Sequence, residues 1–116
     1  MAENYYPIEF DAESSFTIIN NGTAPSPCVV TFIPRVNFSR VVLTGLSKEP
    51  IIVSDVNQDQ VLIIDGENRK VTLDDQDYFE GYNSWEFPKV QPGVNQVGIN
   101  NGSLASLAIE YSTRYI

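Results

Sequence analysis

The sequence predicts an all-β fold in which two antiparallel sheets pack as a sandwich. No window longer than about ten residues has apolar side chains at the i, i+3, i+4 and i+7 positions of an amphipathic helix. Short β-branched or alternating runs instead recur about every 8 to 12 residues, with turn residues between them. No connection is long and apolar enough to be a crossover helix, which excludes parallel βαβ units. At 116 residues and 13.0 kDa, residues 1–116 are expected to form a single domain.

Nine segments have the composition of strands. Each is short and rich in β-branched or aromatic residues, and most are flanked on at least one side by glycine, proline, asparagine or aspartate. In chain order they are Tyr5–Phe10 (the weakest), Ser15–Ile19, Cys28–Ile33, Phe38–Leu43, Ile51–Ser54, Val61–Ile64, Arg69–Leu73, Asn95–Ile99 and Leu104–Tyr111. In the last segment large apolar residues alternate with Glu110, which predicts one buried and one solvated face. Phe38–Leu43 is apolar at consecutive positions toward its end, so we expect burial on both faces there.

Four dipeptides mark the predicted turns. Asp65-Gly66 and Asn101-Gly102 lie between strand segments and are expected to supply the positive-φ positions of tight hairpins. Asn57-Gln58 is expected to turn another pair of strands. Pro92-Gly93 fits a type II turn, in which proline sets φ at one position and glycine takes the positive φ at the next. Asn20–Pro27 is expected to be a rigid, polar connection.

Composition and charge exclude several classes of function. The chain has 15 acidic and 7 basic residues, a formal net charge of −8 and a pI near 4.2. Such a field repels nucleic acid and anionic membranes, and the cations are scattered along the sequence. The longest wholly aliphatic runs, Val41–Leu43 and Val61–Ile64, are far too short to span a bilayer. We therefore expect a soluble protein with neither a nucleic-acid nor a membrane partner.

The absence of histidine removes most nucleophilic and metal chemistry. It excludes a Ser-His-Asp triad, a Cys-His dyad and any histidine ligand to a metal. Cys28 is the only cysteine, so no intrachain disulfide can form, and its place at the start of an apolar run predicts a buried packing thiol. The N-terminus lacks the basic and apolar regions of a secretory signal, which predicts synthesis in a reducing cytoplasm.

The stretch Asp74–Phe87 is the richest in polar and aromatic residues, and it supports two interpretations. Aromatic rings beside carboxylates and amides are a usual means of holding a sugar, with the ring stacked on the sugar and the polar groups on its hydroxyls. In that interpretation Trp85 or Tyr82 is the stacking platform. The candidate carbohydrate-binding residues are Asp77, Tyr78, Glu80, Tyr82, Asn83 and Trp85. The alternative, and the more common role of such residues, is that the aromatic side chains plug one end of the sandwich.

Other chemistry finds less support. Asp55–Asp59 copies the opening of an EF-hand calcium loop, but Gln60 and Gly66 stand where that loop needs glycine and glutamate, so an EF-hand is rejected. A looser calcium site on Asp74, Asp75 and Asp77 is an alternative to a solvated acidic turn. No pair among the acidic residues is singled out for glycoside hydrolysis. We expect no enzyme activity, no catalytic residue, no cofactor and no metal.

Three stretches together resemble a known family. Asn21–Pro27 is similar to N-x-G-T-A-P-S-P, Phe87–Asn95 to F-P-x-L-x-P-G-x-N and Ile109–Ile116 to I-E-Y-R-x-R-Y-L, with Ile64–Asn68 and Val71–Leu73 between them. This combination resembles the C-terminal domain of siphophage distal tail proteins, the phage tail component family found in phages and prophages. The order and spacing of the motifs carry the resemblance, since each motif alone is a turn signal.

The resemblance implies a galectin-like or jelly-roll β-sandwich that projects from the hub joining the tail tube to the host-recognition baseplate. It further implies a structural or adaptor role, other tail or baseplate proteins as partners, and a place at the virion tail tip after synthesis in the bacterial cytoplasm. In that family a separate N-terminal domain builds the ring. Residues 1–116 contain no counterpart of it, so we expect either an excised C-terminal half or a stand-alone relative, and ring assembly is not attributed to these residues. The family supplies no catalytic residues, and its sugar-binding members are a minority, so binding of host wall polysaccharide is the alternative function. The stretch Asp74–Phe87 is longer than the resemblance leads us to expect.

Overall fold

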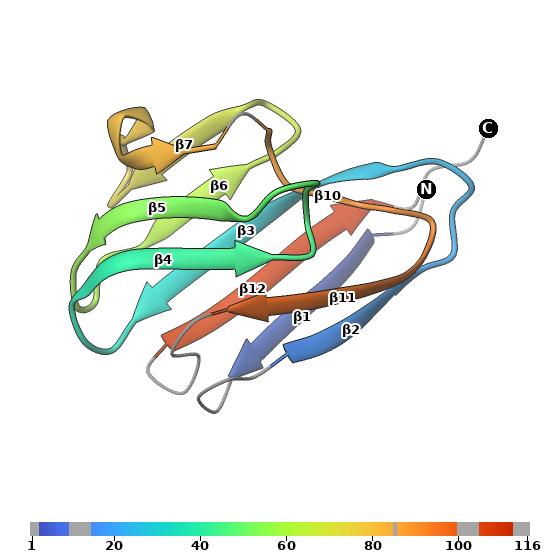
Figure 1. The fold of residues 1–116 in the computed structure, drawn as a ribbon, viewed down its shortest axis with the longest axis horizontal. Coiled ribbons are helices and arrows are strands. Elements are labelled where there is room, and N and C mark those ends of the chain that lie inside the picture. Colours follow the sequence, from blue (N-terminus) through green and yellow to red (C-terminus); the bar gives the residue numbers. More distant parts are fainter. Residues whose placement is uncertain (1–2, 10–14, 85, 100–104, 113–116) are drawn as a thin grey trace.

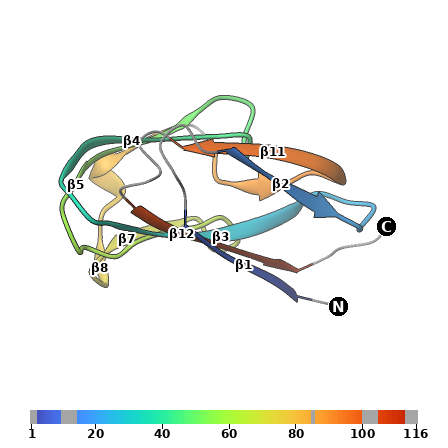
Figure 2. The ribbon, with the colours of Figure 1, turned by 90° about the horizontal axis from the view of Figure 1, so that it is seen from below.

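The molecule is a β-sandwich, as the sequence predicts. The computed structural model describes residues 3–9, 15–84, 86–99 and 105–112, and side chains within residues 17–84, 86–99 and 105–111. Figures 1 and 2 show two layers of strands that face each other. The elements are β1 (Glu3–Glu9), β2 (Ser15–Asn20), β3 (Ser26–Pro34), β4 (Phe38–Thr44), β5 (Ile51–Val56), β6 (Leu62–Asp65), β7 (Lys70–Leu73), β8 (Gln76–Asp77), the 3-10 turn η1 (Phe79–Gly81), β9 (Tyr82–Asn83), β10 (Lys89–Val90), β11 (Gly93–Ile99) and β12 (Ala105–Ser112).

Every strand pair is antiparallel. One sheet has the order β1-β12-β3-β6-β7-β8, with β10 also paired to β3, and the other has the order β2-β11-β4-β5-β9. The central strand β3 pairs with β12 on one side and with β6 and β10 on the other. Consecutive strands therefore often change sheets, which brings segments far apart in the sequence side by side.

The core lies between the two layers and is built by alternation along the strands. On β3 every second residue from Ser26 to Pro34 is buried. On β12 Leu107, Ile109 and Tyr111 are buried and Glu110 is exposed, which confirms the predicted one-sided strand. At the end of β4, Val42 is half-buried between two fully buried neighbours, so the expected burial on both faces holds in part.

The structure confirms some of the predicted turns and not others. Pro92-Gly93 is confirmed, because Gly93 has a φ of 91°. The Asp65-Gly66 hairpin joins β6 to β7, but the positive φ falls on Arg69 rather than on Gly66. Asn57-Gln58 was expected to pair two strands and does not, because β5 and β6 belong to opposite sheets. Asn101-Gly102 lies outside the described residues.

All nine predicted strands form, and no bound differs from the predicted one by more than two residues. The two-residue strands β8, β9 and β10 and the turn η1 were not predicted, because so short a segment has no periodicity to detect. In the parts of the chain that the structure describes, there is no helix with the length and hydropathy needed to cross a bilayer.

Candidate functional site

The segment Asp74–Phe87 closes one end of the sandwich by joining its two sheets. It begins as a two-residue turn, in which Asp74 and Asp75 have φ values of 51° and 65° and lie between the paired residues Leu73 and Gln76. Two consecutive positive φ values are the signature of a type I′ hairpin, and aspartate tolerates them better than most residues. The segment therefore first adds β8 to one sheet and then adds β9 to the other.

Asp74 is a structural carboxylate. Its Oδ1 accepts a hydrogen bond from the Val61 amide at 2.8 Å, and its own amide donates to the Val61 carbonyl at 2.9 Å. These two bonds tie the hairpin turn to the chain that enters β6. The looser calcium site on the acidic turn is a prediction that the structure does not support, since no group of three or more acidic or cysteine side chains among the described residues is placed to hold a metal ion.

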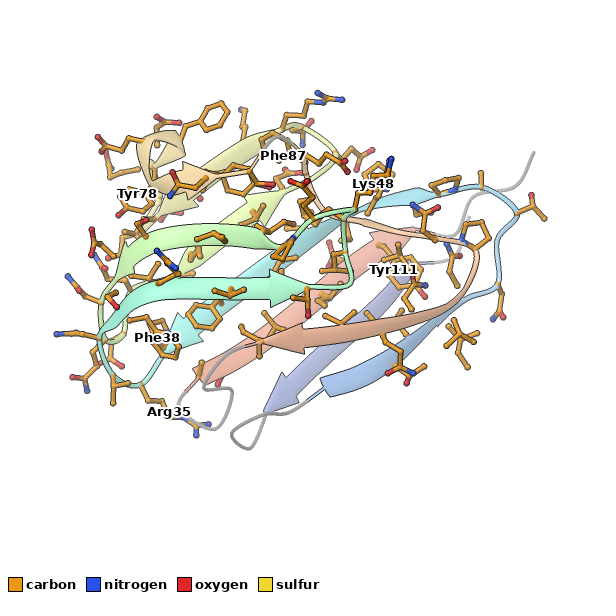
Figure 3. All side chains as sticks on the ribbon, in the orientation of Figure 1. Arg35, Phe38, Lys48, Tyr78, Phe87 and Tyr111 are labelled. Atoms are coloured by element: carbon orange, nitrogen blue, oxygen red, sulfur yellow. The ribbon has the colours of Figure 1, made fainter. Side chains whose placement is uncertain are left out.

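Tyr78 bridges the two sheets. Its amide donates to the Val71 carbonyl on β7 at 2.8 Å, and its hydroxyl lies 2.7 Å from the Ser54 carbonyl and 3.0 Å from the Asp55 carbonyl at the end of β5. Partial burial, and then the charges of Asp55 and Glu80, raise the pKa of this hydroxyl, so it remains a donor at neutral pH. Figure 3 shows Tyr78 at the end of the molecule where β5 and β7 terminate.

Tyr82 is a plug rather than an open platform. Only 7% of its surface is exposed, and its ring stacks on Phe87 with centroids 5.0 Å apart. Its hydroxyl donates to the Glu86 carbonyl, and burial raises the pKa of Tyr82 to about 12. Phe79 meets both rings edge-on at 6.1 and 6.0 Å, yet 53% of its own surface is exposed. Among the described aromatic residues of this segment, the most exposed ring is therefore that of Phe79, which is not one of the candidates named from the sequence.

The remaining predicted site residues fall into three groups. Asp77 and Glu80 are exposed. Asn83 is also exposed, and its Nδ2 donates to Ser54 Oγ at 3.0 Å and to the Gly81 carbonyl at 3.3 Å. Trp85 lies outside the described residues. The structure thus places Tyr78, Tyr82 and Asn83 beside β5, where Tyr82 and Asn83 pair with Val53 and Ile52. Of the predicted acidic residues that the structure describes, Glu80 is close enough to Tyr78 for its charge to raise the pKa of that hydroxyl.

An open hollow of about 670 Å³ lies beside Asn83. It is lined by Glu49, Pro50, Ile52, Tyr82, Asn83 and Ser84. The first three come from the approach to β5 and from β5 itself, and they meet β9 through the pairing of Ile52 with Asn83. Sequence reasoning missed them because that pairing joins residues more than thirty positions apart, and no local pattern signals it.

A second polar region lies where the chain leaves this segment. Two hollows of about 520 and 260 Å³ share Glu86 and Lys89, and the other charged residues that line them are Lys48 and Arg69. Gly66 allows the chain to pass closely here, because a Cβ at that position would lie 2.2 Å from the Pro88 carbonyl oxygen. Lys48 and Phe87 are labelled in Figure 3.

Cys28 lies beneath this region and is a packing residue, as the sequence predicts. Its surface is fully buried, and burial raises the pKa of its thiol to about 12. A thiol with that pKa is protonated at neutral pH and is a poor nucleophile. Its amide donates to the Pro88 carbonyl at 3.2 Å, so it also helps to hold β10 beside β3.

Fold and site together define the chain as a β-sandwich domain in which most of the side-chain hydrogen bonds described above go to the domain's own backbone. Residues 21–115 match the family model described as the siphovirus-type tail component, C-terminal domain. The chain therefore belongs to this family of phage tail components. No curated protein sequence matches the chain.

The fold resembles a solved tail protein. The crystal structure of the SPP1 Dit (gp 19.1) protein, described as a paradigm of the hub adsorption apparatus in phages that infect Gram-positive bacteria, superposes with a TM-score of 0.76 at 8% sequence identity. The superposition covers 97% of this chain and 46% of the SPP1 protein, so this chain spans about half the length of that protein. At such low identity the likeness concerns the fold alone.

Proposed function

We propose that this domain is a non-enzymatic adaptor at the tip of a phage tail, where it projects from the distal hub and contacts other tail or baseplate proteins. The observation that carries the proposal is the family match over residues 21–115. The likeness in fold to the SPP1 Dit protein supports a position at the hub.

The use of polar side chains in the fold supports an adaptor role. Asn95, Asp74, Tyr78 and Asp65 each bind backbone groups of the domain, mostly across turns or between strands. Side chains committed in this way hold the loops in one conformation, and a rigid module with fixed loops suits a part that sets the position of its neighbours.

Immunogold labelling of virions tests the proposed position. Antibodies against the purified domain are applied to intact particles of the phage that encodes it, and serum depleted with the same domain is the matched control. We expect gold at the distal end of the tail. Label along the tail tube or on the capsid, or no label beyond that of the depleted serum, would overturn the placement at the tip.

As a second function we propose binding of host wall polysaccharide. The residues proposed to bind it are the candidates named from the sequence, Asp77, Tyr78, Glu80, Tyr82, Asn83 and Trp85. Two observations favour a sugar at this end of the molecule. The ring of Phe79 is more than half exposed, and the hollow beside Asn83 carries an amide, a hydroxyl and the carboxylate of Glu49. The buried ring of Tyr82 supports the wall of such a site rather than stacking on the ligand.

A further inference from the structure

Strand β2 lies at one edge of its sheet. A sheet edge presents unpaired backbone N–H and C=O groups to any strand that approaches, and natural proteins protect such edges with charges, proline or shortness. Among the described residues, β2 pairs only with β11 and ends its sheet, as Figure 1 shows at the margin of the molecule.

Three of the four sheet edges carry such protection. The edge strand β1 contains Glu3, Pro7 and Glu9. The edge strands β8 and β9 have two residues each, and β8 includes Asp77. By contrast, β2 has six residues, Ser-Phe-Thr-Ile-Ile-Asn, with neither a charge nor a proline. Among the strands that the structure describes, it is the edge strand without such protection.

The face beside this edge is also uncharged. Thr17 and Ile19 of β2 are exposed, and they pair with Gln96 and Val94 of β11, which are exposed as well. Ile19 and Val94 lie side by side with 54% and 66% of their surfaces exposed. The seven residues of β11 contain no charged residue either. In a chain with 15 acidic and 7 basic residues, two adjacent strands without charge form a distinct surface.

We infer that β2 pairs antiparallel with β2 of a second copy of this chain, so that one sheet continues across both copies. Two molecules of net charge −8 repel each other, and a contact between them is favoured where neither carries charge. The edges β1, β8 and β9 of another copy are charged or short, which leaves β2 itself as the matching strand. An isologous pair about a two-fold axis satisfies both edges at once and stops growth at a dimer.

The pairing places Thr17 near the two-fold axis. When the outward residues of the two strands face each other, a register centred on Thr17 sets Ile19 of one copy opposite Ser15 of the other. In this register residues 15–19 of the two strands pair with each other, and five paired residues make about five inter-strand hydrogen bonds. The apolar pair Ile19 and Val94 of each copy then lies next to the junction and loses solvent contact.

Sedimentation equilibrium on the full chain tests the inference, from about 10 µM to about 1 mM protein. We expect a concentration-dependent dimer. Thr17→Lys places two like charges at the junction and should weaken the dimer by about tenfold or more. The matched control is Gln96→Lys, which adds the same charge to the same face, on the residue paired with Thr17 but one strand inside the edge. It should change the dimer constant by less than about threefold.

Salt gives an independent readout. Because the proposed contact is neutral and the two copies repel, raising ionic strength toward about 0.15 M, where the Debye length is about 8 Å, should strengthen the dimer. A contact between opposite charges, such as an acidic loop on Lys48 or Lys89, would weaken instead and would overturn the assignment to β2. A wild-type chain that stays monomeric at every concentration would also overturn it and would leave this edge for a strand of another tail protein.

Folding of the variants is checked by circular dichroism and by amide hydrogen exchange. At high concentration, the β2 amides of the wild type should gain protection that Thr17→Lys lacks, while the β3 amides stay equally protected in both. If Thr17→Lys loses its fold, Ile19→Lys, on the same exposed face of β2, replaces it in the same measurement. A dimer unaffected by either charge would contradict pairing through β2.

Discussion

The β10–β11 corner (Pro88–Asn95) and the aromatic connection (Asp74–Phe87) meet above Cys28, and they use polar residues in opposite ways. At the corner, Asn95 is buried, and its side chain binds the Gln91 amide and carbonyl at 2.9 and 2.8 Å. In the connection, Asn83 is exposed and its amide reaches a serine hydroxyl. Asn95 therefore stabilises the turn at the corner, whereas Asn83 in the connection lines an open hollow.

The contrast indicates that the polar residues of the corner specify the fold, whereas those of the connection are accessible to a ligand or partner. The corner carries the P-G-x-N motif that matched the family, and the alternation that follows it places Val97 and Ile99 in the core. The connection lies between the motifs, and we expect its exposed residues Asp77, Glu80 and Asn83 to contribute little to folding. The loss in the free energy of unfolding caused by a substitution should therefore depend on which of the two regions holds the residue and on how deeply the residue is buried.

The largest effect is expected where the connection reaches the core. Tyr82→Ala removes a buried ring stacked on Phe87 and should lower the free energy of unfolding by about 3 to 5 kcal/mol, as buried aromatic truncations do. Urea denaturation followed by fluorescence or circular dichroism measures it. A loss below about 1 kcal/mol would show that the ring is peripheral.

The second prediction compares the two asparagines directly. Asn95→Ala leaves the Gln91 amide and carbonyl without their partner and also removes weaker contacts to the Ile18 and Gly93 carbonyls, so we expect a loss of about 2 to 3 kcal/mol. Asn83→Ala, at an exposed site, should cost about 0.5 kcal/mol or less. Equal losses at both positions would remove the distinction between the corner and the connection.

The third prediction concerns pH and the cysteine beneath both regions. In the unfolded chain the Cys28 thiol ionises near pH 9.0, whereas burial raises its pKa to about 12 in the folded chain. The contribution of the buried thiol to the free energy of unfolding is therefore fully present below pH 9 and is lost as the pH rises from 9 toward 12. The loss amounts to about 1.4 kcal/mol per pH unit. Tyr82, whose pKa is also about 12, adds a loss of the same sign above pH 10.

Cys28→Ala isolates the thiol. The variant should show a shallower fall in the free energy of unfolding between pH 9 and pH 10 than the wild type, both measured with reductant present. The change in the free energy of unfolding between pH 7 and pH 8 serves as the control, because the Cys28 thiol titrates little there in either the folded or the unfolded chain. Parallel curves across both intervals would mean that the thiol is solvated in the folded chain.

The sequence predicted the fold better than the site, and the reason is physical. Period-two burial runs through the nine residues of β3 and through residues 105–111 of β12, so the pattern is strong enough to detect. The corner was predicted because proline fixes φ at Pro92 and glycine readily adopts the positive φ that the turn needs at Gly93. The burial of Tyr82 and the hollow lined by Glu49 and Asn83 depend on pairing between β5 and β9, and no local residue pattern encodes that long-range contact.

A small stability effect is also expected for Phe79. Its ring is more than half exposed and meets Tyr82 and Phe87 only edge-on, so Phe79→Ala should cost about 1 kcal/mol or less. If the connection binds wall polysaccharide, the same substitution should lower affinity measured by isothermal titration at unchanged fold, since an exposed ring supplies stacking area to a sugar. Ile33→Ala, another partly exposed apolar residue on β3, is the matched control and should leave binding unchanged. Binding that is absent in the wild type, or equal in the wild type and both variants, would remove the support for a sugar site at this end and leave the adaptor role.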